Sequence, residues 1–238
     1  MKAHVGCSGW NYKHWKGVFY PKELKQADWL SFYCSRFDTL ELNFTFYRQP
    51  SDATFEKWHG AAPDGFLFSV KMSRFITHTR RLKVERDSIE RFFGGVSILS
   101  DKLGVVLIQL PPTLAFDAGL LSTFFSTLDP GLRYSVEARH ESFVSEAFFS
   151  LLRQRNIAWC ISETAGRYPY REAVTADFVY VRLHGREKLY ASSYLDDELR
   201  DWKEKIKSWG RETYVYFDND FEGHAPANAS TLRAMFEK

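Results

Sequence analysis

Short stretches of alternating apolar and polar residues recur along the 238-residue chain, and each of them predicts a β-strand. In the stretch 39–44, Leu40, Leu42 and Phe44 fall on one face of the strand, whereas Glu41 and Asn43 fall on the other. The stretch 104–110 is continuously apolar, as expected for a strand that is covered on both faces. The predicted strands are 4–9, 39–44, 66–72, 104–110, 134–139, 158–163, 178–184 and 213–219.

Helical patterns separate these strands, at 28–37, 51–59, 87–100, 117–128, 145–156, 196–209 and 228–236. The connection 164–177 is only weakly helical, so we expect the sixth helix to be missing or vestigial. Eight βα units predict an α/β fold with a closed parallel sheet, the (β/α)8 TIM barrel, as a single domain over residues 1–238. An open doubly wound sheet is the alternative, but neither GxGxxG nor GxxxxGK[ST] is present.

The alternation also predicts which side chains enter the barrel. If the apolar residues face the helices, charged and amide groups point inward near the C-terminal ends of the strands, where barrel enzymes hold their catalytic residues. On the sixth strand either Ser162 or Glu163 takes this position, and on the eighth either Asp218 or Asn219 does. The other inward residues are Glu41, Asn43, Lys71, Gln109, Glu137, Arg139, Arg182 and His184.

These residues suggest an active site for an anionic substrate. The candidate catalytic residues are Glu41, Glu137 and His184: either glutamate is a candidate general base, and His184 is the candidate partner acid. The candidate substrate-binding residues are cations, amides and loop aromatic residues, namely Lys71, Arg74, Arg139, Arg182, Asn43, Gln109, Asn219, Trp10 and Tyr47. The structural alternative is a salt-bridge network that neutralises itself inside the barrel.

Composition narrows the function classes only slightly. The chain is 45% hydrophobic with a formal net charge of +2, so it is neither a disordered nor a strongly basic protein. Its three cysteines are far apart and lack CxxC spacing, which argues against disulfides and a zinc site. No apolar signal segment or membrane span is evident, and we expect a cytoplasmic protein without a membrane partner.

The chain resembles the YecE-like family, a family of unknown function (DUF72), along essentially its whole length. The matching motifs are GCSGWNYKHWKGVFYP at 6–21, ELNFTFYRQP at 41–50, FSVKMSRFITH at 68–78, LGVVLIQLPP at 103–112, VEARHESF at 136–143, YVRLHG at 180–185, YFDND at 216–220 and APANA at 225–229. The resemblance implies a TIM barrel but no activity. The likeness of such barrels to endonuclease IV and sugar isomerases is an analogy of fold.

We expect an enzyme, a hydrolase or lyase that acts on a phosphate- or carboxylate-bearing small molecule or sugar. Paired glutamates also fit glycoside hydrolysis. We predict no cofactor, and a divalent metal bound by Glu41, Glu137, His184 and Asp218 is the weaker alternative. The main rival is a nucleic-acid-binding or phosphodiester-processing barrel, for which the basic loop with Arg80 and Arg81 would track a phosphate backbone. A scaffold barrel with an empty mouth is the third class.

Overall fold

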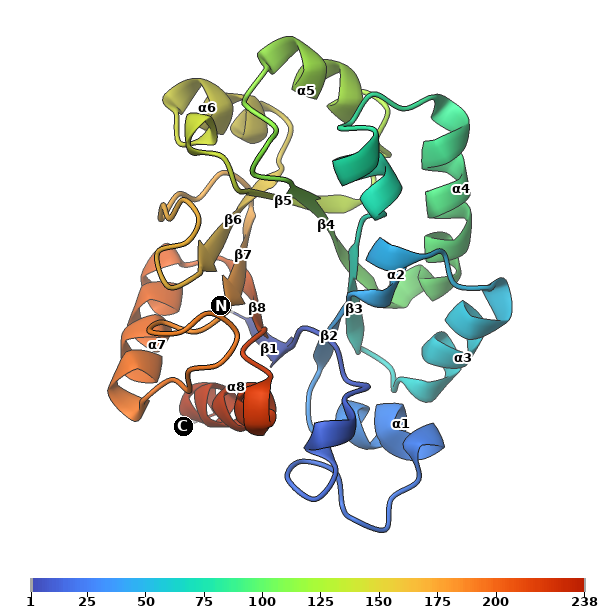
Figure 1. Ribbon diagram of the computed structural model, residues 1–238, viewed down its shortest axis with the longest axis vertical. Coiled ribbons are helices and arrows are strands. Elements are labelled where there is room, and N and C mark those ends of the chain that lie inside the picture. Colours follow the sequence, from blue (N-terminus) through green and yellow to red (C-terminus); the bar gives the residue numbers. More distant parts are fainter. Residues whose placement is uncertain (1, 238) are drawn as a thin grey trace.

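The computed structural model describes residues 2–237 and shows eight parallel strands in a nearly closed barrel surrounded by helices (Figure 1). The sheet order is β1-β8-β7-β6-β5-β4-β3-β2. The strands are β1 (Ala3–Cys7), β2 (Thr39–Leu42), β3 (Leu67–Lys71), β4 (Leu103–Leu110), β5 (Arg133–Ala138), β6 (Ala158–Glu163), β7 (Phe178–Leu183) and β8 (Glu212–Phe217). The predicted TIM-barrel fold is therefore confirmed.

The helices also follow the predicted order. They are α1 (Trp29–Cys34), α2 (Phe44–Tyr47), α3 (Asp52–Ala61), α4 (Arg86–Val96), α5 (Ala118–Phe125), α6 (Glu146–Gln154), α7 (Asp196–Trp209) and α8 (His224–Phe236). No helix occurs in the described connection between β6 and β7, as the weak helical pattern predicted. The prediction was wrong at Phe44, which begins α2 instead of ending β2 and is 38% exposed instead of packing under a helix.

The barrel closes between β1 and β2 through a short junction. Ser8 forms a parallel β-bridge with Glu41, and the amide of Gly9 donates to the Glu41 carbonyl at 2.9 Å. Gly6 permits the close approach, since a Cβ there would lie 2.2 Å from the carbonyl oxygen of Thr39. The N-terminal residues 6–9 therefore join Glu41 on the wall of the barrel mouth.

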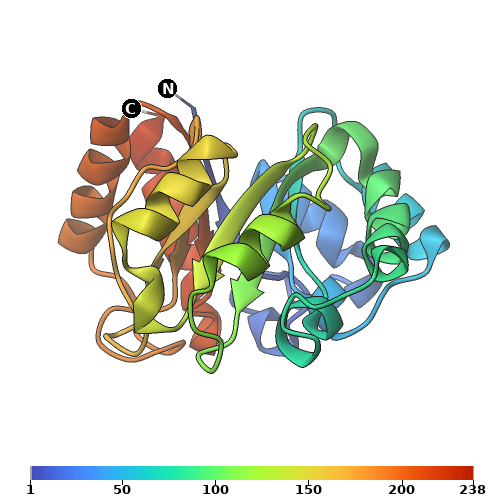
Figure 2. The same cartoon turned by 90° about the horizontal axis from the view of Figure 1, so that it is seen from above.

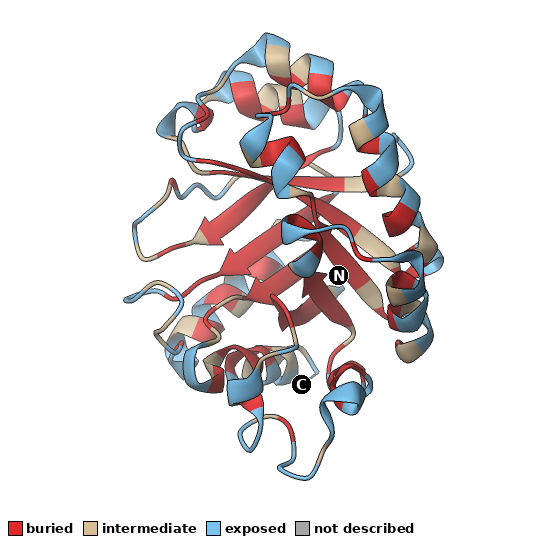
Figure 3. Ribbon diagram, turned by 45° about the vertical axis from the view of Figure 1, so that its right-hand side comes forward, coloured by how far each residue is buried: buried red, intermediate tan, exposed pale blue. Residues whose placement is uncertain are grey.

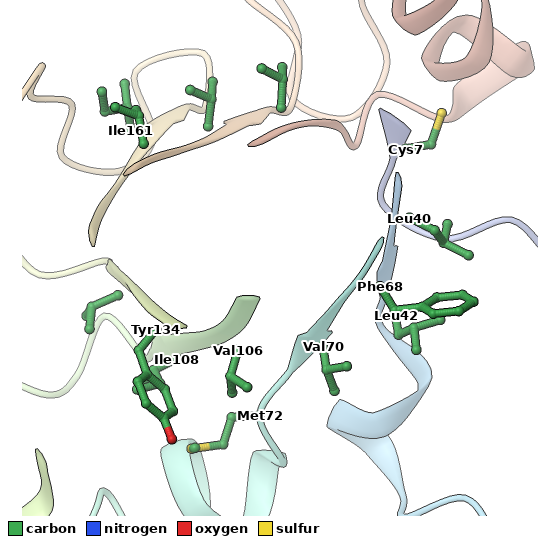
Figure 4. Close-up of a cluster of buried hydrophobic side chains, with 14 of the residues drawn as sticks. Cys7, Leu40, Leu42, Phe68, Val70, Met72, Val106, Ile108, Tyr134 and Ile161 are labelled. Atoms are coloured by element: carbon green, nitrogen blue, oxygen red, sulfur yellow. The ribbon is translucent and has the colours of Figure 1, made fainter. Parts of the chain in front are cut away.

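The apolar core lies between the strands and the helices. Figure 4 shows Leu40, Leu42, Phe68, Val70 and Val106 pointing away from the barrel interior, and all five are fully buried. The strands are buried along nearly their whole length, whereas the helices expose their outer faces (Figure 3). This arrangement confirms the predicted outward direction of these apolar side chains, whereas a second, smaller apolar cluster, which includes Val105, Leu107, Cys160 and Phe178, is formed by side chains on the other face of the strands.

Both ends of the described chain lie at the end of the barrel opposite the strand arrowheads (Figure 2). The loops at the arrowhead end come from segments far apart in sequence, and they surround the mouth. Within residues 2–237, no helix has the length and apolar character needed to cross a membrane. The three cysteines are buried and free, in agreement with the predicted lack of disulfides.

Candidate functional site

Arg182, in β7, is the centre of a polar cluster at the C-terminal end of the barrel. Its guanidinium binds Glu41 twice, from Nε to Oε2 at 3.0 Å and from Nη2 to Oε1 at 2.8 Å. Tyr180 donates to Glu41 Oε2 at 2.6 Å, and Ser8 donates to Oε1. Arg182 is 1% exposed and Glu41 is 0% exposed, so this bidentate ion pair is removed from solvent.

Arg182 also joins two carboxylates on other strands. Its Nη1 donates to Glu137 Oε2 at 2.7 Å, and its Nη2 donates to Asp218 Oδ2 at 3.0 Å. His184 places Nδ1 2.9 Å from the same Asp218 oxygen and accepts from Arg182 Nη1 through Nε2 at 3.2 Å. Gln109 donates to Glu137 Oε2 at 2.9 Å. We call this set the Arg182 cluster: Ser8, Glu41, Gln109, Glu137, Tyr180, Arg182, His184 and Asp218.

Two carboxylates of the Arg182 cluster, Glu137 and Asp218, have lowered pKa values. Burial acts to raise the pKa of Glu137, but the charges of Arg139, Arg182 and other neighbours overcome it and hold that pKa well below its usual range. Burial likewise opposes ionisation of Asp218, yet Arg182 and the adjacent His184 keep its pKa low. Carboxylates with such low pKa values are weak bases, so these groups are better suited to fix Arg182 than to remove a proton.

Two cations project beyond the Arg182 cluster. Lys71 ends β3 and is 8% exposed, and its Nζ lies 4.2 Å from the ring centroid of Phe46. Among residues 2–237, this ammonium forms neither a hydrogen bond nor an ion pair. Arg139 follows β5, donates from Nε to Glu137 Oε1 at 3.0 Å and stacks on Tyr168 at 4.5 Å. Its two terminal nitrogens have no partner within the described chain, so both cations can receive an anion.

An aromatic pocket of about 680 Å³ opens beside these polar groups. Segments 9–12 and 43–51 form it together with α3, and its ring-bearing side chains are Trp10, Tyr12, Phe44, Tyr47 and Trp58. Asn43 connects the pocket to the Arg182 cluster, since its Nδ2 donates to Ser8 Oγ at 2.6 Å. Its Oδ1 is buried without a partner in the described part of the chain. The pocket can therefore hold a ring or an aliphatic body next to a polar mouth.

The structure divides the predicted site residues into groups. Those that reach the mouth or the aromatic pocket are Trp10, Asn43, Tyr47, Lys71, Arg74 and Arg139. Those buried within the Arg182 cluster are Glu41, Gln109, Glu137, Arg182 and His184. Asn219 lies elsewhere: it is fully buried, and its Nδ2 donates to the Ser192 carbonyl and to Asn228 Oδ1. The prediction that Asn219 binds the substrate is therefore wrong. Of the two alternatives on the eighth strand, Asp218 is the one that faces the mouth, where it contacts Arg182.

Several residues of the site were not selected from the sequence. Asp218 was one of two alternatives, because a strand that ends in Asp-Asn-Asp gives no signal for which side chain turns inward. His78 was assigned only to the basic loop, whereas a π-helical turn over Phe75–Thr79 places its ring against Phe46, with centroids 5.0 Å apart. On the sixth strand, Ser162 pairs in register with Arg182, so it occupies the inward position.

The mouth contains carboxylate and imidazole groups, which are possible ligands for a metal ion. Within residues 2–237, no group of three or more His, Cys, Asp or Glu side chains has an arrangement that could hold one. Glu41, Glu137 and Asp218 are instead bridged by the guanidinium of Arg182. The position that a cation would take between these carboxylates is thus filled by a side chain.

Comparison with known proteins gives one family. Residues 4–238 match the model "Protein of unknown function DUF72". The chain is 25% identical to the UPF0759 protein YunF of Bacillus subtilis, over 98% of this chain and 94% of that protein. It is 29% identical to a DUF72 family protein of known crystal structure from Thermotoga maritima, with all of both chains covered and a TM-score of 0.91. A DUF72 family protein from Enterococcus faecalis, 20% identical, has the same fold, with a TM-score of 0.86 over 99% of this chain and 96% of that one. The chain therefore belongs to the DUF72 family of proteins of unknown function.

Proposed function

We propose that this protein is an enzyme, a hydrolase or lyase, that binds an anionic small molecule or sugar at the C-terminal mouth of the barrel. The observation that carries the proposal is a pair of cations with free donors beside a cluster whose own charges are paired: the Lys71 ammonium has no hydrogen-bond or ion-pair partner in the described chain, and Arg139 uses only Nε, on Glu137. Burying a lysine without a carboxylate costs stability, and such a cost is typical of functional sites.

Each group of residues takes a role from its position. Lys71 and Arg139 bind the phosphate or carboxylate, and Arg74 contributes charge from the exposed loop that follows β3. Asn43 hydrogen-bonds the substrate through its free Oδ1, while Trp10 and Tyr47 contact its body in the aromatic pocket. Glu41, Glu137, Gln109, His184 and Arg182 act as positioning residues, because they are buried and already bound to one another.

The proposal is tested by thermal shift of the purified protein against phosphorylated sugars, sugar acids and their uncharged counterparts. A ligand at a hundredfold its Kd should stabilise the fold by about 2.7 kcal/mol. We expect a shift with the anionic compounds alone, and we expect Arg139→Gln to weaken it. Lys83→Gln is the matched control, since Lys83 is an exposed cation in a nearby loop and its loss should change nothing.

A nucleic-acid ligand is the competing outcome. Arg80 and Arg81 are exposed in the loop beyond the π-helical turn, and Phe75 beside them is 49% exposed. Shifts produced only by oligonucleotides, reduced by modest salt and by Arg80→Gln, would replace the small-molecule proposal with binding of a nucleic acid.

A further inference from the structure

Lys71 differs from the other buried lysine of the described chain. Lys102 is 5% exposed and donates from Nζ to two backbone carbonyls, those of His59 at 2.9 Å and Ala62 at 2.6 Å. Lys71 is similarly buried, but its ammonium has only the face of Phe46 next to it. Lys102 therefore has the partners of a structural lysine, whereas the Lys71 nitrogen keeps its own bonding capacity for a ligand.

We propose that Lys71 is a covalent catalytic residue, whose amine forms an imine with the carbonyl carbon of a substrate that also carries a phosphate or carboxylate. This inference rests on the proposed function and assigns the anionic group to Arg139 alone, so that the Lys71 nitrogen meets the carbonyl carbon instead of the anion. It narrows the substrate class to aldehydes, ketones and 2-oxo acids with an anionic group. It also favours a lyase, since a protonated imine withdraws electrons from the neighbouring carbon–carbon bond.

The surroundings of Lys71 favour the uncharged amine that this chemistry needs. Burial and the charge of Arg182 together lower the pKa of Lys71 to about 8, against the opposing effect of Glu137 and Glu41. At pH 7 roughly a tenth of the amine is then neutral, far more than for a lysine in water. Arg139 acts in the same direction as Arg182, so the same guanidinium that would hold the anion also promotes the neutral amine.

His78 lies near Lys71 as an uncharged neighbour. Its ring packs against Phe46, the residue that also contacts Lys71 Nζ. Burial and the nearby charges of Lys71, Arg139 and Arg74 lower the pKa of His78 to about 4, so at neutral pH the imidazole is uncharged and is a weak base that can serve as a hydrogen-bonding group. Hydrogen bonding to Thr77, with Nδ1 2.9 Å from Oγ1, orients the ring.

The step is balanced without any further reagent. The neutral Lys71 nitrogen attacks the carbonyl carbon and forms the C–N bond while the C=O π bond breaks, and the proton that the nitrogen then loses is transferred to the oxygen to give a carbinolamine. A second proton, supplied by solvent, lets this hydroxyl leave as water, and the nitrogen lone pair forms the C=N bond. The products are a protonated imine on Lys71 and one water molecule, with no change of oxidation state.

The test is reductive trapping on the whole protein at pH 7. The probes are glycolaldehyde phosphate, its uncharged analogue glycolaldehyde, and glyoxylate, each with cyanoborohydride, followed by peptide mapping. We expect the two anionic probes to modify Lys71 at least roughly tenfold more than any other lysine, because its neutral fraction is much larger. Lys71→Arg keeps the positive charge but forms no stable imine, so trapping at this position should disappear, whereas Lys83→Arg should leave it unchanged.

Thermal shift with the same probes separates the two proposals. Anion-dependent stabilisation without preferential trapping at Lys71 would overturn the covalent role and leave anion binding at the mouth in place. Equal trapping with glycolaldehyde and glycolaldehyde phosphate, spread over exposed lysines, would also overturn it. Neither trapping nor a shift with any anionic probe would overturn both proposals. Retained anion-dependent shifts in Lys71→Arg would support the inference, since they would show that only the imine was lost.

Discussion

The two ends of the barrel both contain a network of ionisable side chains, but the two networks differ in their burial and in their pairing. At the N-terminal end of the strands, His4 is fully buried between Asp38, with Nδ1 2.8 Å from Oδ2, and Glu212, with Nε2 3.0 Å from Oε1. Arg133 donates to the other oxygen of Glu212 at 2.7 Å and to the Tyr214 hydroxyl at 2.9 Å. We call these five residues the basal cluster, and each of its charged groups has a partner.

The mouth has a similar cluster around Arg182 and, in addition, two cations with unused bonding capacity, Lys71 and Arg139. The basal cluster is also more exposed to solvent, since the side chain of Arg133 is 39% exposed and that of Arg182 is 1% exposed. The comparison separates a network whose charges are paired within itself from one that lies next to cations with free donors. A network of paired charges alone therefore does not indicate a site, and our proposed site at the mouth rests on the cations beside the Arg182 cluster.

The largest difference between the two ends is expected for loss of the central arginine. Arg182→Met leaves Glu41, Glu137 and Asp218 buried without their cation, and we expect a loss of about 3–5 kcal/mol in unfolding free energy. Arg133→Met at the solvated basal cluster should cost no more than about 1 kcal/mol. Urea denaturation of both variants measures the difference, and equal losses would contradict the distinction between the clusters.

Removal of one tyrosine hydroxyl at each end of the barrel should also destabilise the mouth more than the basal cluster, with smaller losses of unfolding free energy. Tyr180→Phe deletes the 2.6 Å hydrogen bond to the buried Glu41 carboxyl group, and we expect a cost of about 1.5–3 kcal/mol. Tyr214→Phe removes a group that accepts from the partly exposed Arg133, and a loss of at most about 1 kcal/mol is expected. Thermal unfolding of the two matched variants checks the order, which a larger effect at Tyr214 would reverse.

The pH dependence of the unfolding free energy should show that the pKa of Lys71 is lowered in the folded protein. The pKa of Lys71 falls to about 8 on folding, so above that pH the unfolded chain binds more protons than the native protein and stability rises with pH. Between pH 7 and pH 9 we expect wild type to gain about 1 kcal/mol relative to Lys71→Met. Taking the difference between the proteins removes the contributions of cysteines and tyrosines. If the difference in unfolding free energy between wild type and Lys71→Met does not change with pH, Lys71 has the pKa of an ordinary solvated lysine.

The smallest effect is expected at the rim of the aromatic pocket. Tyr47 is 75% exposed, so Tyr47→Ala should leave the melting temperature nearly unchanged. If its ring contacts the substrate, the variant should weaken the binding of an anionic ligand by about 1 kcal/mol, as measured by calorimetry. Val18→Ala serves as the control, since Val18 is 64% exposed and lies outside the residues that line the pocket. Unchanged affinity in Tyr47→Ala would remove the pocket from the binding site.

The sequence by itself determined the barrel and the direction of most strand side chains. The period-two alternation placed Leu40 and Leu42 outside and Glu41 inside, and the number of βα units required a closed parallel sheet. The prediction failed where the alternation ended, at Phe44 and at the choice between Asp218 and Asn219. Beyond the last ladder hydrogen bond the chain turns, so a residue's parity no longer fixes its direction.

Only the tertiary structure decided which charges cancel. Glu41 and Arg182 are separated by 141 positions in the chain, yet they form a bidentate ion pair in the mouth. The same folding left Lys71 without a carboxylate and brought segments 9–12 and 43–51 together around one pocket. A sequence contains the list of charges, but the energy of each depends on distance and burial, which arise only when the strands close into a barrel.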